Sequence, residues 1–361
     1  MMIAMEEQEI LDALPERLLP WFAGHARALP WRADREPHHV WLSEIMLQQT
    51  RVEAVKGYYA RFLSALPDIP ALAAAAPDTL TKLWEGLGYY SRVRSLQRAA
   101  QVILARHGGV FPSDYGAIRS LPGIGDYTAG AIASICFEQP APAVDGNLLR
   151  VLTRLTGDTR CVDEPATKRA WRESLAAVYP AGRCGDFTQA LMELGATVCL
   201  PNGAPDCGGC PMRDLCRSAS GGWKTLPVRK AKRPRRQETL TVFLLRCDGR
   251  TAVRRRPDSG LLAGLWEFPN VPGHLTPEQA IRTAEDWGAQ PRELELSLRR
   301  SHIFTHVEWD MQCYLLRCAA EPDGFVWATR AALAGDYALP TAFRMFRDVG
   351  ENEETNRKST P

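Results

Sequence analysis

Apolar positions recur at helical spacing through most of the first 220 residues, and short turns with Pro or Gly separate the periodic stretches. In one stretch, Val40–Leu66, the apolar residues approximate a single helical stripe. Pro112 and Ser113 supply a plausible N-cap entry to another helix. The helices predicted after the first stretch are Asp78–Glu85, Val93–His107, Asp114–Leu121, Tyr127–Glu138, Asn147–Leu155, Pro165–Val178 and Asp186–Gly195.

The pattern changes near residue 222. Lys224–Arg236 holds seven Lys or Arg residues, two Pro and no acidic residue, which indicates an exposed linker. Beyond it the apolar period shifts toward two, which is typical of strands. The predicted strands are Thr239–Cys247, Arg250–Arg255, Leu294–Arg299 and Glu308–Arg317, and one helix, Pro277–Trp287, lies among them. We therefore expect a mostly α domain over 1–220, a linker over 221–237, an α+β domain over 238–350 and a polar, disordered tail over 351–361.

Composition narrows the class of protein. The chain has 361 residues, which suits two domains, and its net charge of +2 means that any nucleic-acid surface must be a local patch. Met1–Ile10 has no basic-then-apolar signal pattern, and no apolar run approaches the roughly 20 residues of a membrane span. We expect a reduced, cytoplasmic protein with no membrane partner.

Four of the ten cysteines crowd into CLPNGAPDCGGCPMRDLC, with the spacing Cys-x7-Cys-x2-Cys-x5-Cys. The four are Cys199, Cys207, Cys210 and Cys216. Zinc sites usually use two CxxC pairs, whereas only one is present here, so a cubane iron–sulfur cluster, [4Fe-4S], is the better interpretation. The six other cysteines are far apart and are expected to be buried small side chains.

LPGIGDYTAG lies between two predicted helices. Gly123 and Gly125 permit a tight turn whose outward backbone N–H groups can bind a phosphate without recognising the base sequence. The Leu-Pro-Gly-Ile-Gly order between helices is a strong helix–hairpin–helix signal.

Two carboxylates flank this hairpin in the sequence, one far upstream and one shortly downstream. Asp145, in PAVDGNLLRVL, precedes a helix and could be an ordinary N-cap. Glu44, in VWLSEIMLQQT, could be an ordinary solvated helix glutamate. Taken alone, each residue fits its ordinary structural role better than a catalytic one.

The order WLSEIMLQQT, LPGIGDYTA, VDGN and then the cysteine run resembles the MutY family of adenine DNA glycosylases, in the endonuclease III superfamily. The resemblance covers nearly the whole chain. Many members have six residues between the first two cysteines, whereas this chain has seven, Leu200–Asp206. An extra loop residue between two ligands is tolerable.

The resemblance implies a two-carboxylate reaction that breaks a base–sugar bond. Glu44 is then the acid that protonates adenine, and burial among apolar neighbours helps it to hold a proton. Asp145 stabilises the oxocarbenium charge, either electrostatically or as a transient nucleophile, and Tyr127 and Asn147 support it. Bifunctional relatives carry a nucleophilic lysine at the position of Tyr127, so we expect hydrolysis with little strand cleavage.

Further positions match family residues that contact DNA or the flipped base. Gln189 lies where members contact adenine, and Tyr89 resembles the side chain wedged into the base stack. A core tryptophan is the ordinary alternative for Trp31. The other expected DNA contacts are Gln49, Thr50, Trp31 and Arg32.

The second domain resembles the Nudix-like C-terminal domain of the same family at GLLAGLWEFP. Its Nudix box lacks the Arg-Glu pair, which Ile281 and Arg282 replace, so pyrophosphatase activity is not expected. In the family this domain recognises 8-oxoguanine with a Phe-Ser-His loop, and here the loop is Phe304, Thr305 and His306. Threonine keeps the hydroxyl and adds a methyl group.

The sequence thus predicts a bacterial base excision enzyme that removes adenine opposite 8-oxoguanine or guanine in double-stranded DNA, as a monomer that joins the nucleoid when on DNA. The alternatives are an endonuclease III-type or thymine–guanine glycosylase, a non-catalytic DNA-binding module, and a nucleotide pyrophosphohydrolase. Tyr127 and the Nudix-like domain oppose the first pair, the two carboxylates oppose the second alternative, and the degenerate Nudix box opposes the third.

Overall fold

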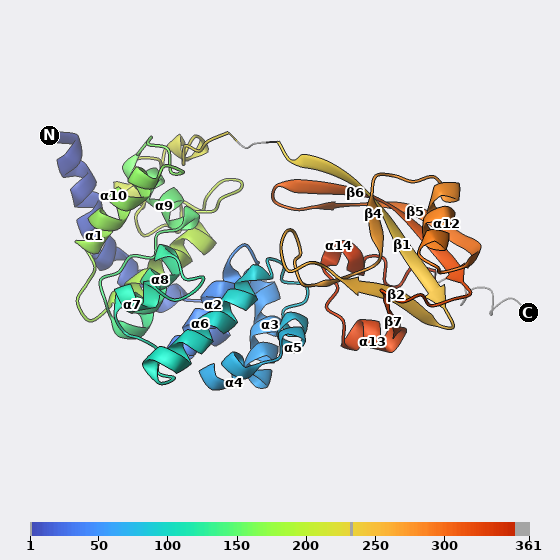
Figure 1. Ribbon diagram of the computed structural model, residues 1–361. Coiled ribbons are helices and arrows are strands. Elements are labelled where there is room, and N and C mark those ends of the chain that lie inside the picture. The colour runs from blue at the N-terminus through green and yellow to red at the C-terminus, as the bar shows by residue number, and fades with distance from the viewer. Residues whose placement is uncertain (1, 232–233, 351–361) are drawn as a thin grey trace, which may run out of the picture. The chain divides into compact units, whose positions relative to one another are not determined.

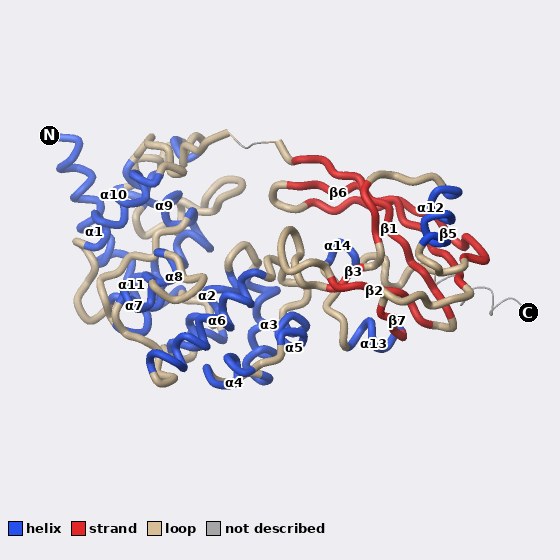
Figure 2. The backbone as a smooth tube through the Cα atoms, in the orientation of Figure 1, coloured by secondary structure: helices blue, strands red, loops and turns tan. Residues whose placement is uncertain are grey.

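The computed structural model describes residues 2–231 and 234–350. The described residues form two compact units. One comprises the chain up to Ala75 together with Arg94–Ala231, and the other comprises Ala76–Val93 together with the chain from residue 234 onward. Helices dominate the first unit and strands the second (Figure 2). This is the expected fold class, a mostly α part and an α+β part, while the predicted domain boundaries stay a prediction.

The first unit is built from helices joined by short turns. They are α1 (Met2–His25), α2 (Pro37–Leu47), α3 (Val52–Ala65), α4 (Ile69–Ala74), α6 (Ser91–His107), α7 (Tyr115–Arg119), α8 (Asp126–Phe137), α9 (Gly146–Thr156), α10 (Pro165–Ala176) and α11 (Cys184–Glu193), with a 3-10 turn at Pro30–Arg32 and a π turn at Leu194–Val198 (Figure 1). The helices expected from the sequence are present within a few residues. The sequence did not indicate α1 or α4.

Two local predictions for this unit are wrong. Val40–Leu66 is not one helix, because the chain breaks between α2 and α3 where Gln49 adopts a left-handed backbone with φ +58°. The N-cap of α7 is Asp114, whose side chain accepts a hydrogen bond from the backbone N–H of Ala117, and not Pro112 or Ser113. A carboxylate at this position satisfies a backbone donor that the first helical turn leaves open.

The core of the first unit lies where α1, α9, α10 and α11 pack together. Leu14 of α1, Leu152 of α9, Trp171 of α10 and Phe187 of α11 are all fully buried there. Elsewhere in the unit, α8 approaches its neighbours closely, since a Cβ on Gly130 would lie 2.5 Å from the carbonyl oxygen of Pro142. That approach brings the segment before α9 against α8.

The second unit is centred on a seven-stranded sheet with strand order β3-β2-β1-β6-β5, in which β4 pairs with β1 and β7 with β2. The strands are β1 (Arg236–Cys247), β2 (Arg250–Arg255), β3 (Trp266–Glu267), β4 (Asn270–Pro272), β5 (Pro291–Ile303), β6 (Val307–Cys318) and β7 (Val326–Thr329). The helices are α5 (Pro77–Leu83), α12 (Pro277–Asp286), α13 (Arg330–Gly335) and α14 (Thr341–Arg344). The sequence missed the short strands β3, β4 and β7 and the helices α13 and α14.

Alternating side chains of the central strand β1 pack into two hydrophobic cores, one on each face of the sheet. Val242 and Leu244 pack with Phe343 beside α13 and α14, whereas Phe243 and Leu245 pack on the α12 side. This follows from the period of two along a strand. β1 pairs in parallel with β6, which explains why the strand is apolar on both faces.

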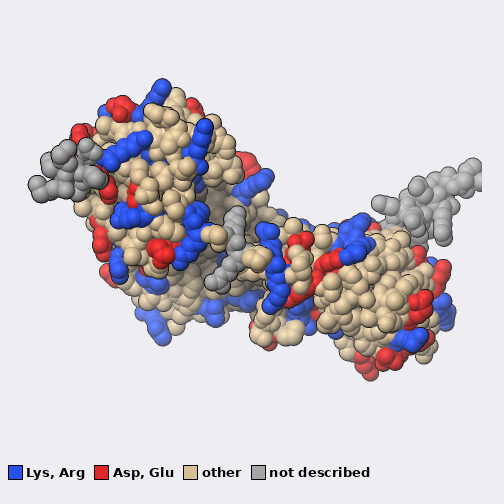
Figure 3. All heavy atoms as spheres, turned by 90° about the horizontal axis from the view of Figure 1, so that it is seen from above, with Lys and Arg blue, Asp and Glu red and all other residues tan. Residues whose placement is uncertain are grey.

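Acidic and basic side chains are interspersed on the face shown in Figure 3, as the small net charge leads one to expect. No helix in the described part of the chain is long and apolar enough to cross a membrane. The tail expected to be disordered lies outside the described residues, as do Lys232 and Arg233 of the basic linker. The rest of that linker is mostly exposed, although Leu226 is buried.

Candidate active site and cysteine cluster

One cavity of about 700 Å³ in the first unit gathers most of the expected site residues. α2 contributes Glu44, the N-terminus of α8 contributes Tyr127, and α11 contributes Gln189. The other expected residues that line it are Trp31, Arg32, Gln49, Thr50, Gly123, Gly125, Asp145 and Asn147. The cavity therefore unites residues that lie as far apart in the sequence as 31 and 189.

Glu44 is buried within α2, with 6% of its surface exposed. Burial raises its pKa to about 7, the nearby Asp145 charge adds to that increase, and a hydrogen bond from Tyr127 and the charge of Arg32 oppose it. Its Oε2 has no hydrogen-bond partner among the described residues. This is a carboxyl group that holds a proton near neutral pH and has one oxygen free to deliver it.

Tyr127 lies between the two carboxyl groups. Its own pKa is raised, first by burial and then by the charges of Glu44 and Asp145, so the phenol stays protonated and donates to Glu44. Thr128, next along α8, accepts a 3.4 Å hydrogen bond from the side chain of Gln48 at the break between α2 and α3. The sequence analysis did not single out Gln48 or Thr128.

Asp145 is the N-cap of α9. Its Oδ1 accepts hydrogen bonds from the backbone N–H groups of Asn147 (2.9 Å) and Leu148 (2.8 Å), and its Oδ2 accepts one from the Asn147 side chain (3.1 Å). Burial raises the pKa of Asp145, and these three donated hydrogen bonds limit the increase because they favour the ionised form. The ordinary N-cap interpretation of Asp145 is therefore confirmed, while its functional role stays a prediction.

Arg150 connects this site to the cysteine run, and the sequence analysis missed it. Its guanidinium donates to Oδ1 of Asn147 (3.0 Å), to the carbonyl oxygen of Cys199 (3.0 Å) and to that of Gly195 (2.9 Å). The sequence signal was an arginine on an otherwise apolar helical stretch, three residues after Asn147. A buried arginine of this kind needs several acceptors, and here all of them lie at functional segments.

The four cysteines of the predicted cluster line one small cavity beside α9. Arg154, four residues after Arg150 in α9, also lines this cavity and donates a hydrogen bond to Sγ of Cys199 at 3.5 Å. Its guanidinium also stacks over the ring of Trp223, 5.8 Å from the centroid. Of the six other cysteines, four are buried as expected, whereas Cys136 and Cys161 are only half-buried.

The remaining expected residues lie in the second unit. Phe304, Thr305 and His306 form the turn between β5 and β6, closed by a hydrogen bond from the N–H of Phe304 to the carbonyl oxygen of Val307. The hydroxyl groups of Thr305 and Tyr89 lie 2.7 Å apart. Tyr89 has a left-handed backbone, with φ +48°, and 45% of its surface is exposed.

The comparisons with known proteins agree with this arrangement. The profile of the HhH-GPD superfamily of base excision DNA repair proteins matches residues 42–176, and that of the NUDIX domain matches residues 241–348. The adenine DNA glycosylase of Mus musculus is 35% identical over 94% of this chain and 78% of its own length. The chain belongs to the adenine DNA glycosylases. The Homo sapiens enzyme of this family is 34% identical over 91% of the chain and 73% of its own length.

Solved structures resemble this adenine DNA glycosylase over its helical part. A thermostable thymine-DNA glycosylase matches with a TM-score of 0.54 and 28% identity, covering 60% of this chain and 98% of its own. A non-covalent endonuclease III–DNA complex matches with a TM-score of 0.50 and 22% identity, covering 59% and 96%, which supports the fold. The chain is therefore a DNA glycosylase of base excision repair with a Nudix-like second part, and the family prediction is confirmed.

Proposed function

We propose that this enzyme hydrolyses the N-glycosidic bond of adenine mispaired with 8-oxoguanine or guanine. The observation that carries the proposal is that Glu44 and Asp145 line one cavity with Tyr127 while differing in surroundings. Two carboxyl groups in unlike environments are what an acid-assisted glycosidic cleavage requires. The acid neutralises the departing base, and the carboxylate stabilises the cationic sugar.

Glu44 acts as the general acid in this proposal. Because its pKa is raised to about 7, a large fraction of the protein carries a protonated Glu44 near neutral pH. Tyr127 keeps donating its hydrogen bond to Glu44 and stabilises the carboxylate that forms as the proton leaves. Adenine enters the cavity only after leaving the helix stack, and the proposed contact to it is Gln189, which lines the same cavity.

Asp145 acts as the anion that stabilises the oxocarbenium-like sugar. The three hydrogen bonds donated to it fix the orientation of its carboxylate, and the Asn147 side chain contributes one of them. A positioned charge of this kind needs no reorganisation as the transition state forms.

The reaction is proposed to be monofunctional. Strand cleavage by Schiff-base chemistry needs an amine nucleophile near the sugar. The described residues that line the cavity include no lysine, and Tyr127 occupies the hairpin position. Gly123 and Gly125 of that hairpin support binding of a DNA phosphate, since their backbone N–H groups begin α8.

Recognition of 8-oxoguanine is assigned to the turn Phe304–His306. The support is its sequence and the hydrogen-bond distance between the hydroxyl groups of Thr305 and Tyr89, which joins two residues predicted to meet DNA. Duplex DNA that contains the mispair is the proposed partner of a monomeric enzyme.

A [4Fe-4S] cluster is proposed on Cys199, Cys207, Cys210 and Cys216. These residues fit the group, because four thiols from one segment line one cavity and Arg154 donates toward one sulfur. When bound, the cluster crosslinks the loop and fixes its shape.

The test uses duplexes that carry adenine opposite 8-oxoguanine, thymine opposite guanine, or thymine glycol, with and without alkali after incubation. We expect adenine release only, with strand breaks only after alkali, and Glu44→Gln should bind DNA but release no base. Release of pyrimidines, or breaks before alkali, would refute the proposal. A colourless protein with stoichiometric zinc would refute the cluster.

A further inference from the structure

Glu193, the last residue of α11, carries a carboxylate that is fully buried. Its Oε1 accepts hydrogen bonds from Nε of Arg27 (2.6 Å) and from the Arg27 backbone N–H (3.2 Å). Its Oε2 accepts one from Nη2 of Arg27 (3.0 Å) and one from Nη2 of Arg32 (2.8 Å). Burial would raise the pKa of Glu193, but the hydrogen bonds from the two arginines outweigh it and hold the pKa below its usual value. The group is therefore a buried anion shared by two cations.

The Glu193 carboxylate is the anion that binds the Arg32 guanidinium. Besides its contact with Glu193, the Arg32 guanidinium donates a 3.2 Å hydrogen bond to the carbonyl oxygen of Arg27 and lies over the ring of Phe22, 5.5 Å from the centroid. Only 15% of the Arg32 side chain is exposed. Removing the negative charge would leave two guanidinium groups facing each other, and their repulsion would move Arg32.

Arg32 and Arg27 both line the cavity that contains Glu44, whereas Glu193 lies behind that wall. We propose that Glu193 is a positioning residue, whose carboxylate grips Arg27 and Arg32 and so keeps the Arg32 guanidinium in the wall of the Glu44 cavity. The inference deepens the proposed function, on which its catalytic consequence rests. Glu193 thereby has a role in the site although it does not line the cavity.

The consequence concerns the proton on Glu44. The charged or titratable groups that act on Glu44 are Tyr127, Asp145 and Arg32, and of these Tyr127 and Arg32 lower its pKa. Cys136 is also close enough for the Glu44 charge to raise its pKa. If Arg32 moves away, Glu44 loses a cation and holds its proton to a higher pH. If Glu193 acted only through its own charge, neutralising it would shift the Glu44 pKa downward instead.

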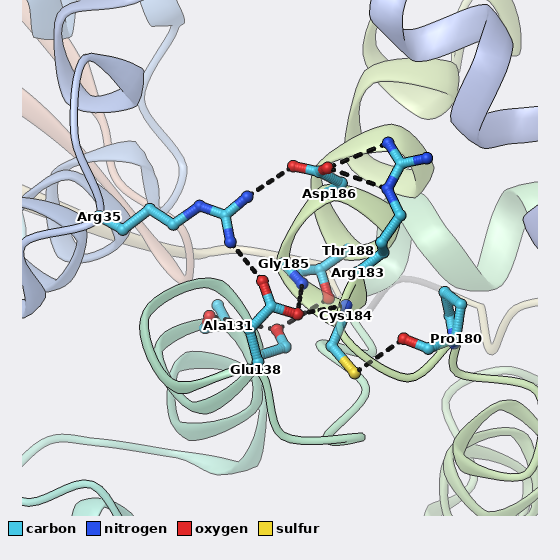
Figure 4. A network of polar contacts seen from close by, with 10 residues as sticks. Arg35, Ala131, Glu138, Pro180, Arg183, Cys184, Gly185, Asp186 and Thr188 are labelled. Atoms are coloured by element: carbon cyan, nitrogen blue, oxygen red, sulfur yellow. Dashed lines mark hydrogen bonds and ion pairs between the residues drawn. The ribbon is translucent and has the colours of Figure 1, made fainter.

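The opposite end of α11 offers a matched control (Figure 4). There Arg35 bridges Asp186 of α11, at 2.7 Å, and Glu138, which in turn accepts a 2.6 Å hydrogen bond from the backbone N–H of Cys184. This network ties the same helix to the same N-terminal loop. Asp186 does not line the Glu44 cavity, so Asp186→Asn weakens the helix–loop attachment without touching Arg32.

The experiment titrates Glu44 in the full-length protein by NMR with carboxyl-labelled glutamate, with the signal assigned by its loss in Glu44→Gln. We expect Arg32→Gln and Glu193→Gln each to raise the Glu44 pKa by up to about one unit. The double variant should match Arg32→Gln alone, and Asp186→Asn should leave the titration unchanged. A downward shift in Glu193→Gln, no shift, or a further shift in the double variant would overturn the proposal.

Two additions keep the test decisive. Should Glu193→Gln fail to fold, Glu193→Asp retracts the carboxylate by one methylene at constant charge, and we expect a smaller upward shift; an unchanged titration then contradicts positioning. The alkaline limb of single-turnover adenine excision should move with the NMR value. If the wild type does not excise adenine, the proposed function fails while the NMR result still decides the role of Glu193.

Discussion

The raised pKa of Glu44 predicts how the free energy of unfolding depends on pH. A carboxyl group whose pKa is about 7 in the folded protein and about 4.5 in the unfolded chain binds its proton more tightly when folded. Its contribution to stability is complete below pH 4.5 and is lost as the pH rises toward 7. Glu44→Gln cannot ionise, so the variant should escape this loss.

The magnitude follows from the two pKa values. Relative to its value at low pH, the free energy of unfolding falls on account of Glu44 by about 0.8 kcal/mol at pH 5 and by about 3.3 kcal/mol at pH 8. Glu44→Gln should therefore gain about 2.5 kcal/mol relative to the wild type between these two pH values. Using the difference between two pH values removes the effects of the amide itself, such as a changed hydrogen bond to Tyr127.

The assay is urea unfolding followed by far-UV circular dichroism, with wild type and variant at both pH values in the same buffer mixture. The same substitution at an exposed position, Glu53→Gln, provides the control and is measured in the same way. A relative stability of Glu44→Gln that is the same at pH 5 and pH 8 would refute the argument that the folded protein holds a proton on Glu44. It would also remove the physical basis of its role as the acid.

Three further predictions concern other parts of the first unit. Burial lowers the pKa of His38 to about 4, so the neutral ring is favoured and the protein should lose about 2 kcal/mol as the pH falls from 7.5 to 5; His38→Leu should abolish that part of the loss in the same unfolding assay. Gly130→Ala should destabilise the protein by about 1–3 kcal/mol, because the new Cβ meets the Pro142 carbonyl oxygen at 2.5 Å, and Gly24→Ala, which meets nothing within 4 Å, is its control. Arg150→Met should lower the rate of adenine excision and the visible absorbance of the proposed iron–sulfur cluster, because the Arg150 guanidinium holds both Asn147 and the Cys199 carbonyl. If the variant keeps both at the wild-type level, this link is dispensable.

Much of the fold could be predicted because most helices and strands have a recognisable pattern of apolar residues in their own sequence. The period of 3.6 through the first part and of two through the second reflects which face of each element is buried. What could not be predicted depends on contacts across the sequence. Gln49 has a left-handed backbone that ends α2 before α3 begins, and because it is not a glycine, nothing in the sequence indicated this break. The strands β3, β4 and β7 are too short to show an alternation of apolar and polar residues.

The candidate site divides in the same way. Glu44, Asp145 and the cysteines could be proposed because each belongs to a motif with a recognisable order in the sequence. Arg150 and Glu193 belong to no such motif. Each is a charged residue within a largely buried helix. Two of the three Arg150 partners lie 45 and 49 residues away, and the Glu193 partners lie 161 and 166 residues away. Only the folded chain shows which charges they meet.

These two missed residues also bear on the proposal that Glu44 and Asp145 have different roles, since each supports the surroundings of one carboxyl group. Asp145 receives hydrogen bonds from a helix N-terminus and from Asn147, which Arg150 holds in place. Glu44 receives one from Tyr127, and its pKa is otherwise set by burial, by the Asp145 charge and by the Arg32 cation, which is hydrogen-bonded to Glu193. In the proposed mechanism, the different roles of Glu44 and Asp145 therefore depend on the buried charged residues Glu193 and Arg150. A variant of either supporting residue should alter one carboxyl group and leave the other nearly unchanged.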